Sequence, residues 1–348
     1  MRALTVLPGK ADSIKLDEVP APPASDGDVL VRALALGVCG TDREIIRGDY
    51  GAAPPGEQRL ILGHESLGRV EQAPAGSGVS KGDLVVGIVR RPDPLPCPAC
   101  AAGEWDMCHN GQYTERGIKE RNGYGSEEWR IDPDFVVKID PALDMLGVLM
   151  EPTSVVAKAW EQSLRIGRRS PSWRPRTVLI TGAGPIGLLA AMMGAQLGLE
   201  LHILDRNDKG LKPELSRALG ATYHAGDLGD LKADIVMECT GADPVILEVL
   251  KHSSPPGVIC FAGVSAGGHK TPFDAGQFNR TMVLENQAIF GTVNANRQHY
   301  RDAAEALAKA DRKWLARLIT RRVPLSRWHE AFEHRDGDIK VILDFTAQ

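Results

Sequence analysis

The glycine-rich run Gly182-Ala183-Gly184-Pro185-Ile186-Gly187 constrains the fold of this chain more than any other feature. It stands between a buried-type strand, Thr177–Thr181, and a helix, Pro185–Leu197. In a dinucleotide-binding fingerprint the first glycine makes a tight turn, the second lets the backbone approach a pyrophosphate, and the third lets the helix pack on the strand. The helix N-terminus then offers free N–H groups to the phosphates. The residues predicted to bind the cofactor are therefore Gly182, Gly184, Pro185, Ile186 and Gly187.

The following strand, Leu201–Asp205, ends in a carboxylate eighteen residues after Gly187. A carboxylate at this place can accept hydrogen bonds from a ribose 2′-hydroxyl, which favours NAD. Arg206 and Lys209 follow directly, and they either accommodate a 2′-phosphate or are ordinary solvated charges. Because Asp205 would repel a phosphate, we expect NAD, with NADP as the alternative. The alternative without a nucleotide site is a chance glycine turn followed by a surface aspartate.

Strands and helices alternate along the second half of the chain, after Pro152. A first helix, Val155–Ile166, is followed by a linker rich in Arg, Ser and Pro. The further strands are Asp234–Cys239, Val258–Gly263 and Ala288–Val293, and the further helices are Pro213–Leu219 and Asp243–His252. This alternation predicts an α/β fold with a doubly wound parallel sheet, which we expect over residues 156–295.

The first half has a different, irregular β character. Short strands such as Val29–Ala35 and Leu84–Val89 are broken by Gly and Pro, which is typical of a partly open barrel. A helix, Arg297–Ala310, and a last strand, Lys340–Phe345, are expected to return to this half. We therefore expect a catalytic domain over residues 1–155 and 296–348, with a loop lobe over 92–125 that is dense in Pro, Gly and Cys.

Composition excludes several classes of function. The length of 348 residues suits two domains, and a formal net charge of −4 gives no electrostatic basis for binding nucleic acid or an anionic membrane. No apolar run reaches the roughly 18 residues that a spanning helix needs. The N-terminal run Met1–Val6 lacks the long apolar core of a signal peptide, so we expect a cytoplasmic protein.

Three cysteines, Cys97, Cys100 and Cys108, lie within twelve positions in the loop lobe. In a cytosolic chain such a cluster indicates metal ligands rather than a disulfide framework. Structural zinc takes four ligands, and Asp93 is the nearest candidate for the fourth. The alternative is a thioredoxin-like redox pair, but that motif needs a helix N-terminus after a strand, which Pro98 in a proline-rich loop does not supply.

A second group of possible zinc ligands comprises Cys39, His64, Glu65 and Glu151. Thiolate, imidazole and carboxylate all bind zinc, and a catalytic zinc keeps one position open. Taken singly, each residue has a bland interpretation: a buried small cysteine, a turn histidine, or surface carboxylates.

Taken together, these motifs resemble the zinc-containing medium-chain dehydrogenases, and more narrowly their glucose dehydrogenase branch. The resemblance covers nearly the whole chain, which implies a GroES-like partly open β-barrel followed by a Rossmann domain. The stretches that carry it are Gly37–Asp42, Gly63–Gly68, Lys81–Val85, the cysteine lobe, Met150–Pro152 and the Gly182 run.

The resemblance implies roles for individual residues. Cys39 and His64 would be catalytic zinc ligands, and Glu65 and Glu151 would join them directly or through water. Thr41 falls where the family has a hydroxyl residue near the reacting oxygen.

Three further stretches point to the glucose branch: Arg90–Pro92, Thr114–Gly117 and Gly291–Asn294. Glu115, Glu151 and Asn294 would contact the sugar, Thr292 and Asn294 the cofactor, and the Asp205-Arg206 pair resembles cofactor discriminators.

This chain also departs from the family's patterns. Glu44 replaces the relay histidine of the alcohol dehydrogenases, and Asp93 stands where many relatives have the first lobe cysteine. Val89 lies where some sugar dehydrogenases have asparagine, so one substrate contact is absent.

The function that we expect is zinc-dependent oxidation of a glucose-like aldose to its lactone, with hydride transfer to NAD or NADP. Within the same class, a polyol or amino-alcohol dehydrogenase is the alternative, and Glu115 and Asn294 favour a sugar. From another class, the alternative is a zinc-free reductase or a nucleotide-sensing protein, against which the presence of Cys39 and His64 argues. The family tends to form dimers or tetramers, so we also expect a homo-oligomer.

Overall fold

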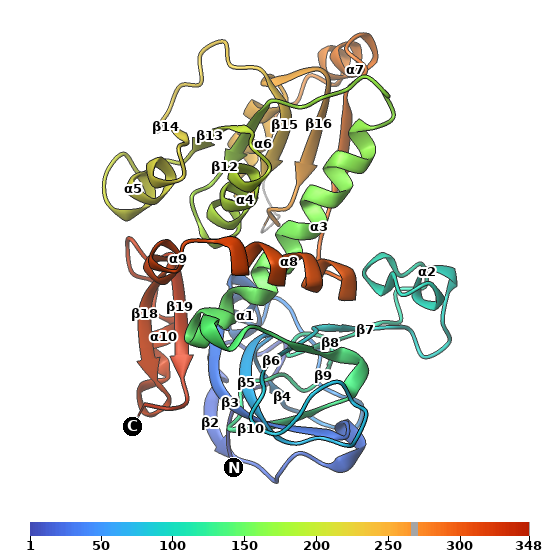
Figure 1. The fold of residues 1–348 in the computed structure, drawn as a ribbon, viewed down its shortest axis with the longest axis vertical. Coiled ribbons are helices and arrows are strands. Elements are labelled where there is room, and N and C mark those ends of the chain that lie inside the picture. Colours follow the sequence, from blue (N-terminus) through green and yellow to red (C-terminus); the bar gives the residue numbers. More distant parts are fainter. Residues whose placement is uncertain (266–270, 348) are drawn as a thin grey trace. The chain divides into compact units, whose positions relative to one another are not determined.

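The computed structural model describes residues 1–265 and 271–347 (Figure 1). The chain divides into two compact units, the first made of Met1–Ser154 and Asn294–Gln348, the second of Val155–Val293. The boundaries fall within two residues of the expected ones, and Asn294 and Ala295 belong to the first unit. No helix within the described ranges is long and apolar enough to cross a membrane.

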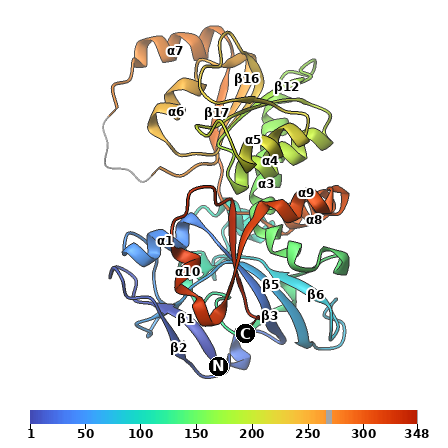
Figure 2. The ribbon, with the colours of Figure 1, turned by 90° about the vertical axis from the view of Figure 1, so that its left-hand side faces the viewer.

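The first unit is built on a seven-stranded sheet centred on β3 (Val29–Val38). β3 pairs antiparallel with β5 (Glu65–Gln72), β10 (Glu128–Ile131) and β19 (Lys340–Asp344). The sheet is completed by β6 (Leu84–Gly87), β11 (Val136–Lys138) and β18 (Ile319–Pro324). The last strand of the chain therefore lies beside one of its first strands, as the blue and red ribbons in Figure 2 show.

Burial along β3 explains why its sequence looks irregular. Val29, Val31 and Ala33 are buried while Arg32 is exposed, the alternation of a strand with one solvated face. From Ala35 to Val38 every residue is buried, because β5 and β19 flank this end of the strand. Trp129 and Leu343 join the same hydrophobic cluster.

Two small sheets and several short helices complete the first unit. One sheet has the order β2 (Lys15–Glu18), β1 (Arg2–Val6), β4 (Leu60–Ile61), and the other β7 (Arg90–Arg91), β8 (Thr114–Arg116), β9 (Glu120–Arg121). The α-helices are α1 (Gly40–Arg47), α2 (Pro98–Ala101), α8 (Arg297–Lys309), α9 (Arg312–Leu318) and α10 (His329–Phe332). α3 (Met150–Gly167) begins in the first unit and continues into the second.

The second unit is a six-stranded sheet in which every pair of neighbours is parallel. Its order is β14 (Thr222–His224), β13 (Glu200–Leu204), β12 (Thr177–Thr181), β15 (Ala233–Glu238), β16 (Ser253–Phe261) and β17 (Ala288–Gly291). The helices are α4 (Pro185–Gln196), α5 (Leu211–Ala218), α6 (Asp243–Val249) and α7 (Ala275–Leu284). The strand order reverses between β12 and β15, and open α/β sheets bind ligands at this kind of switch point.

Several of the elements that were not expected have little apolar patterning. α7 has no buried residue, and α1 buries only Asp42 and Ile45. β14 is three residues long and lies at the edge of its sheet. The expected strands and helices are present, with ends shifted by up to five residues.

The pairing of β19 with β3 predicts that the C-terminal strand is part of the core of the first unit. Leu343 is fully buried in β19, so Leu343→Ala should lower the free energy of unfolding by about 2–5 kcal/mol in a urea titration. The matched control is Leu95→Ala, which truncates a side chain that is 82% exposed and should change stability by less than about 0.5 kcal/mol. Equal effects of the two substitutions would contradict this packing.

Candidate active site and nucleotide site

Cys39, His64 and Glu65 come together at one end of the central sheet. One ligand atom from each lies within 4.8 Å of the other two. Gly37 in β3 stands opposite Glu65 in β5, so the register of these antiparallel strands brings Cys39 beside the residues that precede β5. Three of the four predicted catalytic zinc ligands are thus brought together by one strand pair.

Two glycines make this close approach possible. A Cβ on Gly37 would overlap the Glu65 carboxylate, so the carboxylate can lie against the β3 backbone only because residue 37 has no side chain. Gly63 has a φ of +94°, in the left-handed region that favours glycine, and it turns the chain from β4 into His64. Both glycines belong to the motifs that suggested the site.

Asp42 organises the Cys39–His64 pair. Cys39 is the N-cap residue of α1, and its backbone N–H donates to Asp42 Oδ2 at 2.8 Å. Asp42 Oδ1 lies 3.4 Å from His64 Nδ1, with both residues buried. Burial alone would lower the pKa of His64, but Asp42 and Cys39 outweigh it and hold that pKa well above its ordinary value. A carboxylate behind a histidine is the usual way to orient a metal ligand.

Glu65 forms a buried ion pair with Lys340. Both carboxylate oxygens lie 2.7 Å from Lys340 Nζ, which also donates to Val38 O at 3.3 Å. The two side chains are 1% and 3% exposed. Lys340 comes from β19, 275 residues further along the chain, and sequence reasoning did not single it out.

Glu151, the fourth predicted ligand, lies in the first turn of α3 and is buried. It is not a member of the Cys39–His64–Glu65 group, although its carboxyl interacts electrostatically with His64, Glu65 and Lys340. Burial raises the pKa of Glu151 to about 7. A carboxyl with such a pKa can hold or release a proton near neutral pH. Thr41 is the second residue of α1 and is half-buried.

The predicted sugar-contacting residues Glu115 and Asn294 bind each other. Asn294 Nδ2 donates to Glu115 Oε1 at 2.8 Å, and Arg90 donates to the same oxygen from Nε and Nη2, each at 3.0 Å. β7 and β8 place Arg90 opposite Glu115. Asn294 adopts the left-handed conformation with a φ of 61°, so its position depends on an unusual backbone turn. Thr292, the other residue predicted here, is buried just after β17 in the second unit.

The three lobe cysteines also form a group whose sulfurs lie within 4.8 Å of one another. Cys97 is the N-cap of α2, and its sulfur accepts hydrogen bonds from the backbone N–H groups of Cys100 and His109. These bonds lower the pKa of Cys97 to about 6, so it is already disposed to be a thiolate. Burial raises the pKa of Cys100 to about 11.

Asp93, predicted as the fourth lobe ligand, is not brought into that group. Its Oδ1 accepts the Leu95 backbone N–H and its Oδ2 accepts Asn110 Nδ2, both at 2.8 Å. The carboxylate therefore closes the loop around the cysteines, and both of its oxygens already have protein donors.

The glycine-rich run has the geometry expected of a phosphate-binding turn. Gly182 has a φ of +84°, and a Cβ on Gly187 would overlap the Gly182 carbonyl oxygen, so helix and turn pack without room for a side chain. Gly184 is the N-cap of α4, with Pro185 at its first position and no side-chain cap, which leaves the N–H groups of the first turn to a ligand. Asp205 follows β13, and Arg206 beside it is exposed.

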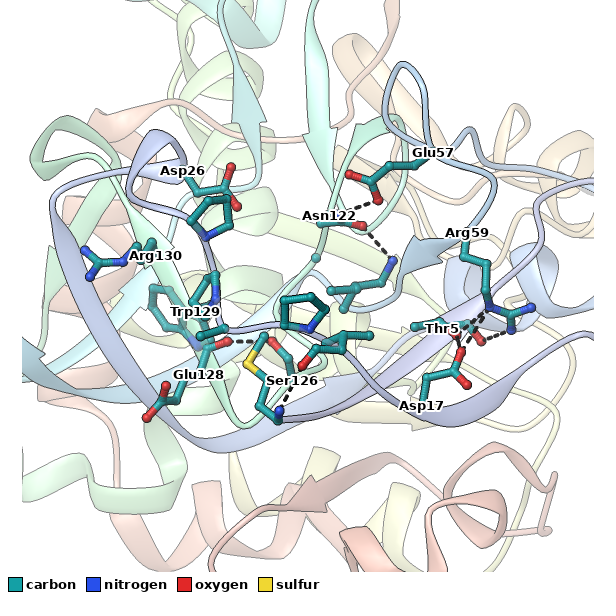
Figure 3. A pocket seen from close by; sticks show the side chains of 18 of the residues that line it. Thr5, Asp17, Asp26, Glu57, Arg59, Asn122, Ser126, Glu128, Trp129 and Arg130 are labelled. Carbon is teal, nitrogen blue, oxygen red and sulfur yellow. Dashed lines mark hydrogen bonds and ion pairs between the residues drawn. The ribbon is translucent and has the colours of Figure 1, made fainter.

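A cavity of about 460 Å³ lies elsewhere in the first unit, around the N-terminal strands (Figure 3). None of the predicted ligand, substrate or cofactor residues lines it. Several of its polar groups pair with one another: Arg59 with Thr5 and Asp17, and Asn122 with Glu57. The cavity is therefore separate from the candidate active site.

Comparisons with known proteins agree with this architecture. Residues 25–141 match the family model of the alcohol dehydrogenase GroES-like domain, and residues 144–345 match that of the glucose dehydrogenase C-terminus. The chain is 38% identical to the glucose 1-dehydrogenase of Methanocella arvoryzae over 362 residues, covering 100% of both. It is 40% identical to glucose 1-dehydrogenase 2 of Vulcanisaeta moutnovskia, covering 99% of both.

A solved structure of Haloferax mediterranei glucose dehydrogenase in complex with NADP, Zn and gluconolactone has a TM-score of 0.90. It is 33% identical, and the match covers 100% of each chain. A GroES-like domain followed by a parallel-sheet dinucleotide domain is the architecture of the medium-chain dehydrogenases, which confirms the predicted fold class. Within that class, the chain belongs to the glucose dehydrogenase family.

Three residues of the site were not predicted from the sequence. Asp42 lies inside the motif around Cys39, so its position three residues after the cysteine could have pointed to it. Lys340 and Lys212, which contacts Asp205, resemble ordinary charged residues of a strand and a helix. Only the three-dimensional pairing reveals them.

Because Glu65 and Lys340 form a buried ion pair, we expect a neutral residue at position 340 to lower the stability of the fold strongly. Lys340→Met leaves a buried carboxylate without its partner and should reduce the free energy of unfolding by about 3–5 kcal/mol. The control Lys309→Met removes an exposed lysine and should change it by less than about 1 kcal/mol. The double variant Lys340→Met/Glu65→Gln should recover part of the loss. A single-variant effect as small as that of the control would refute the role of this pair.

Proposed function

We propose that this chain oxidises an aldose, glucose or a close relative, at the anomeric carbon, giving the lactone and transferring hydride to a nicotinamide dinucleotide. The observation that carries the proposal is the convergence of Cys39, His64 and Glu65 in a chain that also has the glycine-rich nucleotide turn. The relatives named glucose 1-dehydrogenase, and the zinc, NADP and gluconolactone of the Haloferax mediterranei structure, support the same reaction here.

The donor sets fit zinc at two places. Cys39 and His64 would bind a catalytic zinc, with Glu65 and Glu151 joining directly or through water, because thiolate, imidazole and carboxylate are the ligands that zinc takes. Cys97, Cys100 and Cys108 would bind a structural zinc. Asp93 remains the candidate for the fourth ligand of that site, because each of its oxygens accepts one hydrogen bond, from Leu95 or Asn110, and keeps an acceptor position.

The two units have different roles in the proposed reaction. We assign substrate binding and the zinc sites to the first unit and cofactor binding to the second, around Gly182–Gly187 and Asp205. A bound zinc would act as a Lewis acid that lowers the pKa of the substrate hydroxyl, and a nicotinamide cofactor would supply the hydride acceptor.

The residues of the chain perform the remaining steps. Thr41, or a water molecule, is suited to relay the hydroxyl proton to solvent, because a hydroxyl both accepts and donates a hydrogen bond. Glu115 and Asn294, fixed by Arg90, present buried polar groups to the hydroxyls of a sugar. A site with buried polar groups discriminates against substrates that lack the matching hydroxyls.

The activity is tested with a panel of aldoses, polyols, amino alcohols and simple alcohols, following absorbance of the reduced cofactor before and after chelation. We expect chelator-sensitive oxidation of glucose or another aldose. Cys39→Ala should reduce kcat by more than about a hundredfold and lower the zinc content, because it removes a metal ligand. Cys260→Ala is the matched control, a buried thiol in the second unit, and should retain activity. Faster turnover of a polyol or amino alcohol than of any aldose would overturn the sugar assignment.

We further propose that the chain forms a homo-oligomer through the β17 edge of the parallel sheet and the adjoining helix α7. β17 ends the strand order, α7 buries no residue, and Phe273, Val283 and Leu284 expose large apolar side chains. An open strand edge beside an apolar surface is a typical association site.

We also propose that the protein works in a reducing compartment such as the cytoplasm. All six of its cysteines, including the three of the lobe, are free thiols, which supports this location.

If this surface forms the interface, a charged residue placed on it should lower the molecular mass of the protein in solution. Leu284→Glu places a charge where the side chain is 64% exposed, so it should shift the chain to a smaller species in size-exclusion chromatography with light scattering. Leu197→Glu, on an exposed site of the same unit, should leave the mass unchanged. A mass unaffected by Leu284→Glu would exclude this face as the interface.

A further inference from the structure

The carboxylate of Asp205 is almost fully engaged by groups of the chain itself. Its Oδ2 accepts the Ala183 backbone N–H at 2.7 Å and lies 3.3 Å from Lys212 Nζ, and its Oδ1 accepts the Asn207 backbone N–H at 3.0 Å. An ionised carboxylate has about four acceptor positions, so only about one is left for a ribose hydroxyl. The side chain is only 8% exposed.

The negative charge of Asp205 is offset by positively charged side chains close to it. Lys212 is the second residue of α5, and its ammonium pairs with Asp205 while remaining 18% exposed. Across residues 205–212 the side chains carry three positive and two negative charges, from Arg206, Lys209 and Lys212 against Asp205 and Asp208. The expected repulsion between Asp205 and a phosphate is therefore opposed by a direct ion pair.

The start of α5 adds to this preference for an anion. Its N-cap, Gly210, supplies no side-chain cap, so the backbone N–H groups of Leu211 and Lys212 are not bonded by a capping side chain, and Pro213 after them has no N–H. A lysine in the first turn of a helix opposes the helix dipole, which favours anions there. An anion bound next to Lys212 would satisfy both the ammonium and the helix end.

Lys212 is not needed to hold Asp205 in place. The backbone N–H groups of Ala183 and Asn207 fix the two carboxylate oxygens, and the Asp205 N–H donates to His224 O in β14. The Tyr223 hydroxyl donates to Asn207 O at 2.5 Å and anchors the loop from the other side. The role of Lys212 is thus electrostatic rather than structural.

We propose that Lys212 determines the choice between NAD and NADP, by cancelling the charge of Asp205 and presenting its ammonium to the 2′-phosphate of NADP. The chain then accepts both cofactors although the strand ends in an aspartate. This inference rests on the proposed function only in that the Gly182–Gly187 turn binds a nicotinamide dinucleotide. It does not depend on which substrate is oxidised.

The test is a binding measurement on the purified full-length protein, with NADPH and NADH fluorescence titrations and competition by 2′,5′-ADP against 5′-AMP. Lys212→Gln should weaken NADPH and 2′,5′-ADP by about tenfold or more and change NADH and 5′-AMP by less than about threefold. The matched control Lys251→Gln removes an exposed lysine of the same unit, outside this loop, and should alter each Kd by less than about threefold. Thermal unfolding of both variants checks that the fold is retained.

A second variant separates the two parts of the inference. Asp205→Asn removes the carboxylate charge and should tighten NADPH while leaving Lys212 to bind the phosphate, so Lys212→Gln in that background should again weaken NADPH. Equal weakening of NADPH and NADH by Lys212→Gln, or no change in either, would overturn the proposal. Failure of the unmodified protein to bind either cofactor would overturn both this inference and the proposed nucleotide site, whereas normal binding without sugar oxidation would overturn the proposed function alone.

Discussion

The buried ion pair between Glu65 and Lys340 is the interaction on which the arrangement of the first unit depends. Two charges that are 1% and 3% exposed are stable only when they neutralise each other, so β19 must stay beside β3, and β5 must keep its register on the other side. That register is what brings Cys39 next to His64 and Glu65. Gly37 permits the contact, because any side chain there would overlap the carboxylate.

The two units use carboxylates in the same way. Asp42 receives the Cys39 N–H and faces His64, while Asp205 receives the Ala183 and Asn207 N–H groups and faces Lys212. In each case a largely buried acid is held by a backbone donor and lies beside a nitrogen of a neighbouring basic side chain. A ligand at either place therefore meets groups whose orientation is set before it arrives, which reduces the cost of organising them on binding.

Much of this organisation could be predicted from the sequence, where the signal is local. The apolar run of β12, the glycines of the turn and the cysteine spacing of the lobe each encode their structure within a few residues, and the parallel sheet followed from the alternation of strands and helices. The Lys340 partner of Glu65 could not be found, because a charged residue at the start of a strand resembles a solvated one and its partner is 275 residues away. The orientation of Asp93 depends on Asn110 and a tight loop, which the residue type does not reveal. Helix α7 could not be predicted either, because none of its residues is buried.

The most direct test of the central claim is anomalous X-ray diffraction at the zinc absorption edge from crystals of the zinc-loaded protein, with and without a bound aldose. We expect one anomalous peak in contact with Cys39 and His64, sugar density beside it in the soaked crystals, and a second peak among Cys97, Cys100 and Cys108. Zinc at the lobe cysteines alone, with the Cys39 group free of metal and the sugar bound elsewhere or not at all, would contradict it.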